Sequence, residues 1–240
     1  MNWSNFLKDW QAAADEQGFK SEILLEKEGL PILACTKGAP DLRTVYLSSG
    51  VHGDEPSGPQ ALLGLMQSGF FNEQFHWLIC PVLNPTGLTA KTRENAGGID
   101  LNRDYHQCKA DEVCAHINWL KKQETPALFL SLHEDWESTG FYYYEINTGA
   151  ESPSYEEVLT AAAPFFPPEP ENIIDDHEVT KPGWIFHPDY PDIPEGWPEA
   201  IYLSRMGCPL SLTFETPSSQ ELVKRVACHQ AVVRCAVERL

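Results

Sequence analysis

The sequence predicts an α/β sandwich with a largely buried central sheet, and three observations support this fold class. Apolar runs of strand length alternate with amphipathic stretches of helix length, an order typical of mixed α/β folds. Several strand candidates are apolar at successive positions, as expected for strands that are covered on both faces. The 240 residues suffice for one large domain, or at most two small ones, and we interpret residues 1–240 as a single domain.

The periodicity places each element in chain order. Residues 1–19 are predicted to form an amphipathic helix with Trp3 and Trp10 on one side, rather than a signal peptide. The last helix is predicted to have a capped start at Ser219, with Glu221 in its first turn. Strands are predicted at residues 23–25, 32–35, 44–48, 75–82, 127–132, 141–146, 200–203 and 210–214, and further helices at 55–67, 111–123, 154–163 and 219–239.

Residues 164–198 differ from the rest of the chain, because prolines, aromatic residues and acids crowd together without a clear period. We interpret this Pro-rich segment as a long ordered loop or insertion rather than a linker. Otherwise its aromatic side chains, Trp184, Phe186, Tyr190 and Trp197, would lie exposed. The floor of a substrate pocket is expected to come from this segment.

Composition argues against several classes of partner. The chain has 35 acidic and 17 basic residues and a formal charge of -18, which argues against nucleic acid or an anionic membrane as the main partner. No apolar run approaches the roughly 20 residues that a spanning helix needs. The seven cysteines are odd in number and form no CxxC pair. They predict reduced, mostly structural thiols and a cytoplasmic location, and they leave the oligomeric state open.

The segment His52-Gly-Asp-Glu55 carries the strongest chemical signal. It follows the apolar run at 45–47 and a small-residue turn at 48–50. A histidine and a carboxylate three positions apart, where a buried strand turns into a helix, can bind one zinc ion from the same side. The alternative is a surface turn that happens to carry a histidine and an acid. Two ligands do not make a site, so this interpretation requires a third.

His133 is the candidate third ligand, because it follows the apolar strand predicted at 127–132. Both histidines would then stand at the carboxyl ends of buried strands, where open α/β sheets bind their ligands. With Glu55 they would leave one position for water, as catalytic zinc sites do. His133 could instead form an ordinary hydrogen bond at a strand end, and Glu134 and Asp135 stay open as competing ligands.

Two further segments carry groups suited to a substrate and to a reaction. The loop after the strand at 75–82 contains Arg93, Asn102 and Arg103 and is too rich in Gly, Asn and Pro to predict a helix. Guanidinium forks beside an amide suit a carboxylate, although such a loop could also be merely solvated. Glu215 ends the last predicted strand, where it could be a general base near a zinc-bound water or could stabilise the next helix.

The ordered set of motifs resembles the M14 zinc carboxypeptidases over roughly residues 44–217. The His-Gly-Asp-Glu motif and the short separation of Arg93 and Arg103 in the sequence are most similar to those of the short bacterial members around the murein peptide amidases. The broader clan includes the succinylglutamate desuccinylases and aspartoacylases. The resemblance implies a three-layer α/β/α sandwich with a mixed central sheet. It rests on His52-x-x-Glu55, Asn84-Pro-x-Gly87, Arg93-x-Asn95, Asp100-Leu-Asn-Arg103, His133 and Glu215.

The resemblance also implies a role for each matched residue. Zn²⁺ would be bound by His52, Glu55 and His133. Glu215 would act as general base, and Arg93 would stabilise the oxyanion. Asn102 and Arg103 would bind the terminal carboxylate of the substrate.

The chain departs from the family pattern at several positions. Asp104-Tyr105 replaces the usual Asn-Phe, and Glu134 follows the histidine where a serine is common. No tyrosine matches the family's mobile tyrosine that covers the substrate, and Tyr190 and Tyr202 are no more than candidates for it.

The sequence therefore predicts a zinc-dependent amide hydrolase of the carboxypeptidase type that acts on a small or unusual peptide, such as a cell-wall peptide. The alternative enzyme is an N-acyl amino acid deacylase of the desuccinylase type, which would grip a single acylated amino acid. The complete set of Arg93, Asn102 and Arg103 favours the peptidase. A catalytically idle, metal-containing binding protein is the alternative from another class. A replacement at Glu215 or Arg93 would have favoured it, and neither residue is replaced.

Overall fold

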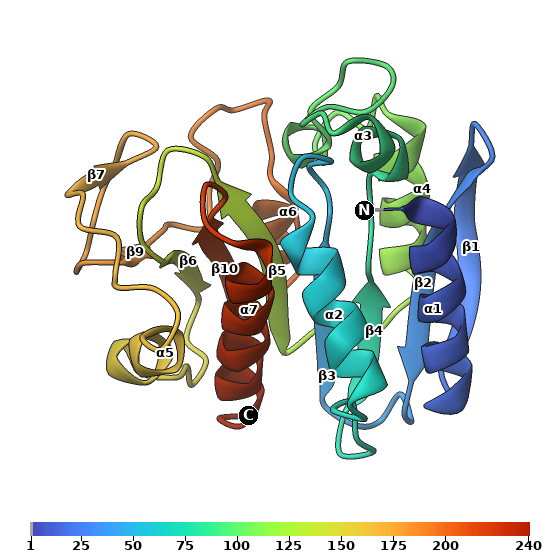
Figure 1. The fold of residues 1–240 in the computed structure, drawn as a ribbon, viewed down its shortest axis with the longest axis horizontal. Coiled ribbons are helices and arrows are strands. Elements are labelled where there is room, and N and C mark those ends of the chain that lie inside the picture. Colours follow the sequence, from blue (N-terminus) through green and yellow to red (C-terminus); the bar gives the residue numbers. More distant parts are fainter. Residues whose placement is uncertain (1) are drawn as a thin grey trace.

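An eight-stranded mixed sheet forms the centre of the computed structural model, which describes residues 2–240 (Figure 1). The strands lie in the order β1-β2-β4-β3-β5-β10-β6-β9. Pairing is parallel from β4 through β3 and β5 to β10, and antiparallel at β1–β2, β2–β4 and β10–β6. The strands are Lys20–Lys27 (β1), Leu30–Lys37 (β2), Thr44–Ser49 (β3), His76–Cys80 (β4), Leu128–Asp135 (β5), Tyr142–Asn147 (β6), Trp184–Phe186 (β9) and Leu210–Pro217 (β10).

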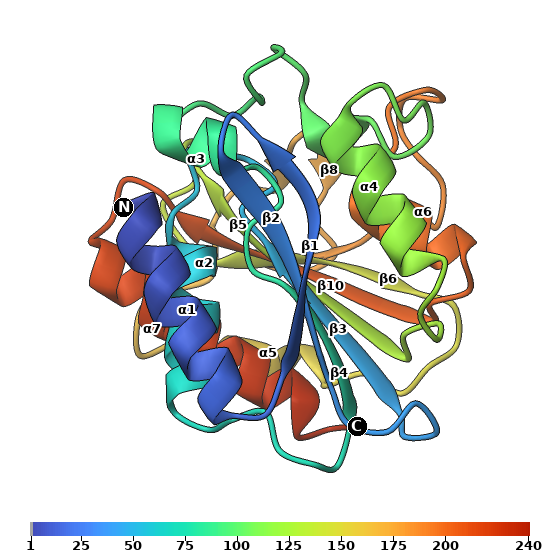
Figure 2. The ribbon, with the colours of Figure 1, turned by 90° about the vertical axis from the view of Figure 1, so that its right-hand side faces the viewer.

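Helices cover both faces of this sheet and make three layers. Figure 2 shows α1, α2, α5 and α7 on one face and α4 and α6 on the other. This confirms the predicted α/β/α sandwich with a mixed sheet. The helices are Trp3–Glu16 (α1), Ser57–Gln67 (α2), Pro85–Ala90 (α3), Asp111–Leu120 (α4), Tyr155–Ala162 (α5), Glu199–Arg205 (α6) and Leu222–Val237 (α7).

The core is divided by the sheet into two large clusters, and β3 contributes to both. Val45 and Leu47 pack against the α1, α2 and α7 layer, whereas Tyr46 packs towards α4 and α6. All three side chains are fully buried. Successive side chains of a strand point to opposite faces, so a strand covered on both faces is apolar at every position.

Most predicted elements are confirmed within a few residues, but three predictions are wrong. Residues 200–203 are helical, in α6, because a short buried apolar run has the same appearance in a helix and in a strand. A short helix, α3, interrupts the expected loop, since Asn84 caps it by accepting a hydrogen bond from Gly87 N at 2.8 Å and Pro85 occupies its first turn. The last helix starts at Leu222 without the expected side-chain cap, because β10 and a turn use the preceding residues.

The Pro-rich segment is ordered, as predicted, and contains β9 and a small hairpin of Ile173–Ile174 (β7) and His177–Glu178 (β8). Its aromatic side chains are less covered than expected. Phe186 and Tyr190 are 50% and 56% exposed, so the argument from burial was wrong for these two residues. Trp184 and Trp197 are half-buried.

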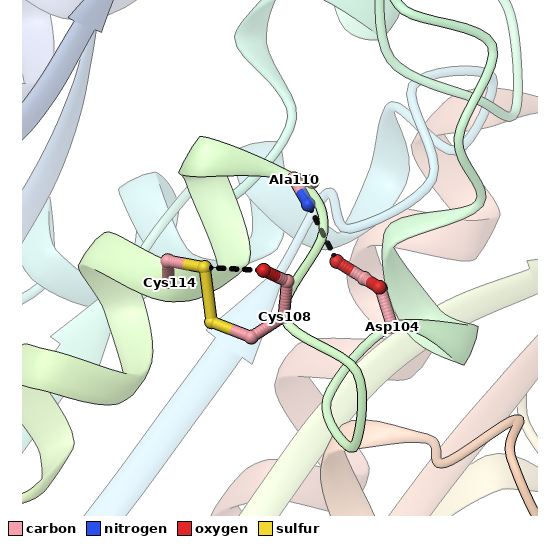
Figure 3. Close-up of a disulfide and its surroundings, with 4 residues drawn as sticks. All are labelled: Asp104, Cys108, Ala110 and Cys114. Atoms are coloured by element: carbon pink, nitrogen blue, oxygen red, sulfur yellow. Dashed lines mark hydrogen bonds between the residues drawn. A yellow bond between two sulfur atoms is a disulfide. The ribbon is translucent and has the colours of Figure 1, made fainter.

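Two of the seven cysteines contradict the prediction of free thiols. Cys108 and Cys114 form a disulfide that closes the turn before α4, next to the hydrogen bond from Ala110 N to Asp104 Oδ2 (Figure 3). The two residues are six positions apart, where the turn folds back onto the first turn of the helix. The remaining cysteines are free, and all of them are buried except Cys235. The cytoplasmic location stays a prediction.

Among residues 2–240, no helix is long and apolar enough to cross a membrane.

Candidate metal centre and catalytic site

The candidate site lies at the carboxyl ends of β3 and β5, where the chain changes direction across the sheet. The connection through α2 leads from β3 to β4 on one side, and the later connection through α4 leads to β5 on the other side of β3. Connections that diverge in this way leave a crevice at the strand ends. His52 follows β3, Glu55 stands before α2, and His133 lies near the end of β5.

The three predicted metal ligands are brought together and buried. Glu55 lies between the two histidines, with Oε1 2.6 Å from His52 Nδ1 and Oε2 3.0 Å from His133 Nδ1. Each residue is at most 4% exposed. Two imidazole nitrogens and one carboxylate are thus able to bind a single ion. They match a His₂Glu zinc set, with both rings presenting Nδ1.

Two positions near the ligand loop that follows β3 accept only glycine. A Cβ atom at Gly53 would lie 1.9 Å from the carbonyl carbon of Gly87, and a Cβ atom at Gly87 would lie 2.4 Å from Asn84 Nδ2. The His52 loop therefore packs directly on the backbone of α3. This close approach, which only glycine permits, fixes His52 against the rest of the site.

The charge and hydrogen bonding of this cluster fit a cation. Burial disfavours charge, but mutual attraction outweighs it, so the pKa of His52 is raised to about 9 and that of Glu55 is lowered to about 2. Burial lowers the pKa of His133. Among the described residues, Glu55 Oε2 is buried without a properly oriented hydrogen-bond donor. A zinc ion would satisfy that oxygen and both Nδ1 atoms.

Asp100 is a site residue to which the sequence analysis gave no role. Its Oδ2 accepts a hydrogen bond from Arg93 Nε at 3.0 Å, and its Oδ1 lies 3.4 Å from His52 Nε2. Burial opposes its charge, but His52 and Arg93 hold the pKa of Asp100 well below its ordinary range. The carboxylate lies behind the ligand ring, in the position from which acids commonly orient zinc-bound histidines. The sequence feature that could have indicated this role is the place of Asp100 at the start of the Asp100-Leu-Asn-Arg103 motif.

The alternative ligands Glu134 and Asp135 have other partners. Glu134 forms an ion pair with Arg225 and accepts a hydrogen bond from Ser57 N at 2.5 Å. Asp135 accepts hydrogen bonds from Tyr142 Oη at 3.2 Å and from Glu137 N at 2.9 Å. Glu134 therefore holds β5 against the helical layer rather than binding a metal.

Glu215 lies beside the metal cluster. In the parallel pairing of β10 with β5, Glu215 is directly opposite His133, and paired residues of neighbouring strands point to the same face. Its carboxyl group lines the same cavity of about 660 Å³ as the three ligands. Burial, together with the negative charges of Glu55 and Asp135, raises the pKa of Glu215 well above its ordinary value. A dication in the cluster would offset that repulsion.

The predicted carboxylate grip also faces this cavity. Asn102 Oδ1 accepts a hydrogen bond from Glu199 N at 3.0 Å, so the Nδ2 donor is the amide atom left for a ligand. Arg103 Nη1 donates to Asn102 O at 2.9 Å, which leaves the rest of its exposed guanidinium free to bind an anion. Arg93 lines the same cavity, and its Nη1 lies 3.3 Å from His52 Nδ1.

Neither candidate for the substrate-covering tyrosine lies in the cavity. Tyr190 is exposed, and Tyr202 packs against Tyr105 in the core beneath α6. The tyrosines that line the cavity are Tyr142 and Tyr144, both on β6. The sequence analysis did not identify them, because the run of tyrosines predicts a buried strand and nothing more.

A buried polar network supports Asn102 from below. Glu199 is 1% exposed and accepts hydrogen bonds from Tyr46 Oη and Ser48 Oγ, each at 2.7 Å. The departure at Tyr105 belongs to the same network, since its hydroxyl lies 2.8 Å from Nδ1 of His116. Burial raises the pKa of Glu199 to about 7, although the two hydroxyl donors lower it.

Glu199 should make stability depend on pH. Its folded-state pKa of about 7 lies above the ordinary value of 4.5, so its favourable contribution is complete below pH 4.5 and is lost as pH rises through 7. The loss is about 3 kcal/mol. We expect Glu199→Gln to remove this part of the difference between urea unfolding at pH 5 and at pH 8. The exposed control Glu26→Gln should keep the wild-type pH dependence. An unchanged pH dependence in Glu199→Gln would contradict the assignment.

Comparison with known proteins gives the same fold. Residues 41–112 match the succinylglutamate desuccinylase/aspartoacylase catalytic domain. Carboxypeptidase 2 of Trichophyton rubrum is 30% identical over 137 residues, which are 51% of this chain and 25% of that protein. This chain thus spans only about a quarter of the relative's length.

Two solved structures illustrate the similarity in fold. A candidate metallopeptidase from Shewanella amazonensis has a TM-score of 0.84 and 23% identity, over 98% of this chain and 92% of that one. A metallo-carboxypeptidase from Pseudomonas aeruginosa, in complex with (2-guanidinoethylmercapto)succinic acid, has a TM-score of 0.66 and 17% identity, over 98% and 68%. The chain therefore has the zinc-carboxypeptidase-like fold that its motifs predict, with a buried His-Glu-His group at the expected place.

Proposed function

We propose that this protein is a zinc-dependent hydrolase that cleaves an amide bond next to a free carboxylate, in the manner of a carboxypeptidase acting on small or unusual peptides. One observation carries the proposal. The buried group of His52, Glu55 and His133 opens into a cavity in which Glu215 stands next to His133 on the neighbouring strand. A closed structural zinc site would need neither an open position nor a neighbouring base.

The chain's own residues supply the rest of the reaction. Zinc, when bound, would polarise the scissile carbonyl and make water more acidic. Glu215 takes the proton of the attacking water and later gives it to the leaving amine. Arg93, held in place by its hydrogen bond to Asp100, stabilises the oxyanion that develops on the carbonyl oxygen.

The carboxylate requirement follows from Asn102 and Arg103. An amide donor and a largely free guanidinium face the cavity on the side of the loop that follows α3. In a protein with a charge of -18, an anionic end group needs such a local cationic site. The ligand of the Pseudomonas structure carries carboxylates, which agrees with this preference.

A deacylase of the desuccinylase type is the second candidate, because residues 41–112 match that catalytic domain. It would use the same metal group and the same Asn-Arg pair on a single acylated amino acid. The two candidates differ in whether the acyl side of the scissile bond is an amino acid or a simple acid. A panel of C-terminal dipeptides, murein peptides and N-acyl amino acids, tested on zinc-loaded protein, distinguishes them. Lack of turnover on the whole panel would favour a metal-containing binding protein.

Blocking the substrate's carboxylate should reveal the role of Arg103. We expect conversion of this carboxylate to an amide to raise KM strongly for the wild type. The penalty should largely disappear in Arg103→Ala, whose KM for the free acid is already high. If Arg103 merely braced its loop, the wild type would cleave amidated and free-acid substrates alike. That result would point to an endo-acting amidase.

A further inference from the structure

A second cluster of metal-binding side chains lies on the wall of the same cavity, away from the His-Glu-His group. It consists of His177, His187 and Asp192, all from the Pro-rich segment. His177 is on β8, His187 follows β9, and Asp192 is in the loop before α6. The sequence motifs give these residues no role, because the segment has no period and its histidines are ten positions apart.

The geometry of the cluster is that of ligands around a single ion. His177 Nε2 and His187 Nε2 each lie 3.4 Å from the same oxygen, Oδ2 of Asp192. The contact between His187 and Asp192 is within reach of a weak hydrogen bond, but it is longer than a charge-assisted one, which measures about 2.7–2.9 Å. Zinc bonds of about 2.0–2.2 Å in a tetrahedron place neighbouring ligand atoms about 3.3–3.6 Å apart. Both nitrogen–oxygen separations fit that arrangement, and the three ligand atoms all lie within 4.8 Å of one another.

The ring of His187 is oriented for metal binding. Its Nδ1 lies 2.7 Å from the carbonyl oxygen of Pro188, an acceptor, so Nδ1 carries the proton and donates. In the neutral ring, Nε2 presents a lone pair towards Asp192. A backbone carbonyl that fixes the tautomer in this way is a common feature behind zinc-bound histidines. A metal ion between Nε2 and the carboxylate would bind both atoms, in place of the hydrogen bond that a protonated ring would donate.

The surroundings hold the cluster in place and favour positive charge. The ring of Tyr144 packs edge-on against both imidazoles, with centroid distances of 5.7 Å to His177 and 6.1 Å to His187. The backbone N–H of His187 donates to Glu145 O at 2.8 Å, which ties the residue to β6. Asp175 and two other acids of the same cavity wall, Asp176 and Glu137, add negative potential.

We propose that His177, His187 and Asp192 bind a second zinc ion. The donor set of two imidazoles and one carboxylate is one that zinc prefers, and it leaves a fourth position for water or for a ligand in the cavity. The ion joins three separate parts of the Pro-rich segment and so fixes the part of the cavity wall that this segment forms. The assignment does not depend on the proposed hydrolase activity.

Zinc stoichiometry of the metal-free full chain tests the proposal. Titration of the wild type at neutral pH, followed by calorimetry and by elemental analysis after dialysis, should give two zinc ions per chain. Asp192→Asn should weaken the second site by more than about 100-fold, since loss of an outer partner alone costs 10–100-fold. Its side chain is 59% exposed, so the variant should fold. His187→Gln should have the same effect as Asp192→Asn.

Two control variants separate this site from the first. His106→Ala removes an exposed histidine that stacks on Trp197 outside the cluster, and it should keep both ions. His133→Ala should lose the first ion and keep the second. A wild type that binds a single zinc ion would overturn the proposal. Binding of two ions with wild-type affinities in Asp192→Asn and His187→Gln would also overturn it, whatever His133→Ala does.

Discussion

Glu215→Gln should lower kcat by about 10²–10⁴, the usual contribution of a positioned acid–base group. The substitution is nearly isosteric but removes the ability to accept a proton from water. Glu215 is not needed to complete the three-residue metal group, so zinc affinity and stoichiometry should stay close to those of the wild type. Steady-state kinetics on any validated substrate, together with zinc titration of the same preparation, measures both quantities.

Glu137→Gln is the matched control for this experiment. Glu137 lines the same cavity but belongs to neither metal group, so its neutralisation should leave kcat within a few-fold of the wild type. A wild-type kcat in Glu215→Gln would remove Glu215 from the mechanism. Loss of zinc together with activity would instead make it a metal ligand or a structural support.

His133→Ala should abolish binding of the first zinc ion and, with it, hydrolysis. The ring is 3% exposed, its Nδ1 lies 3.0 Å from Glu55 Oε2, and among the described residues His52 is the other histidine of this group, with none to take the place of His133. Loss of a direct ligand should cost more than the 10–100-fold that is typical of outer partners. Zinc titration and activity, measured over a range of added zinc, should both show the loss.

His76→Gln gives the corresponding control. His76 begins β4, at the opposite end of the strands from the metal group, and its Nδ1 lies 3.2 Å from Thr44 Oγ1. It should reduce stability without changing zinc affinity. Stoichiometric zinc of unchanged affinity at the first site in His133→Ala would exclude His133 as a ligand and reopen the choice among its neighbours on β5.

The predicted catalytic residues came from signals that are local in sequence. His52-Gly-Asp-Glu55 fits one side of an ion because both ligands leave the same strand end, and Gly53 is explained by a single backbone approach to Gly87. His133 and Glu215 each end an apolar run, which placed them at strand ends before the strands could be paired. Residue type and spacing therefore sufficed to choose candidates.

Pairing of distant segments decided the remaining features. From the sequence alone, Glu134 and Asp135 could replace His133 as metal ligands. The structure distinguishes them, because Arg225 lies beside Glu134 and Tyr142 lies beside Asp135. Asp100 has a role only because its loop folds back over His52.

Local periodicity located most of the strands, their apolar faces and the strand ends that carry the first metal group, because hydrophobic patterning acts over a few residues. Tertiary structure decided whether residues 200–203 form a strand or a helix, since either can bury a short apolar run. It also decided which tyrosines line the cavity and that His177, His187 and Asp192 meet at one point. The Pro-rich segment has no period of its own, and its shape depends on contacts with β6 and with Tyr105, which are distant in sequence.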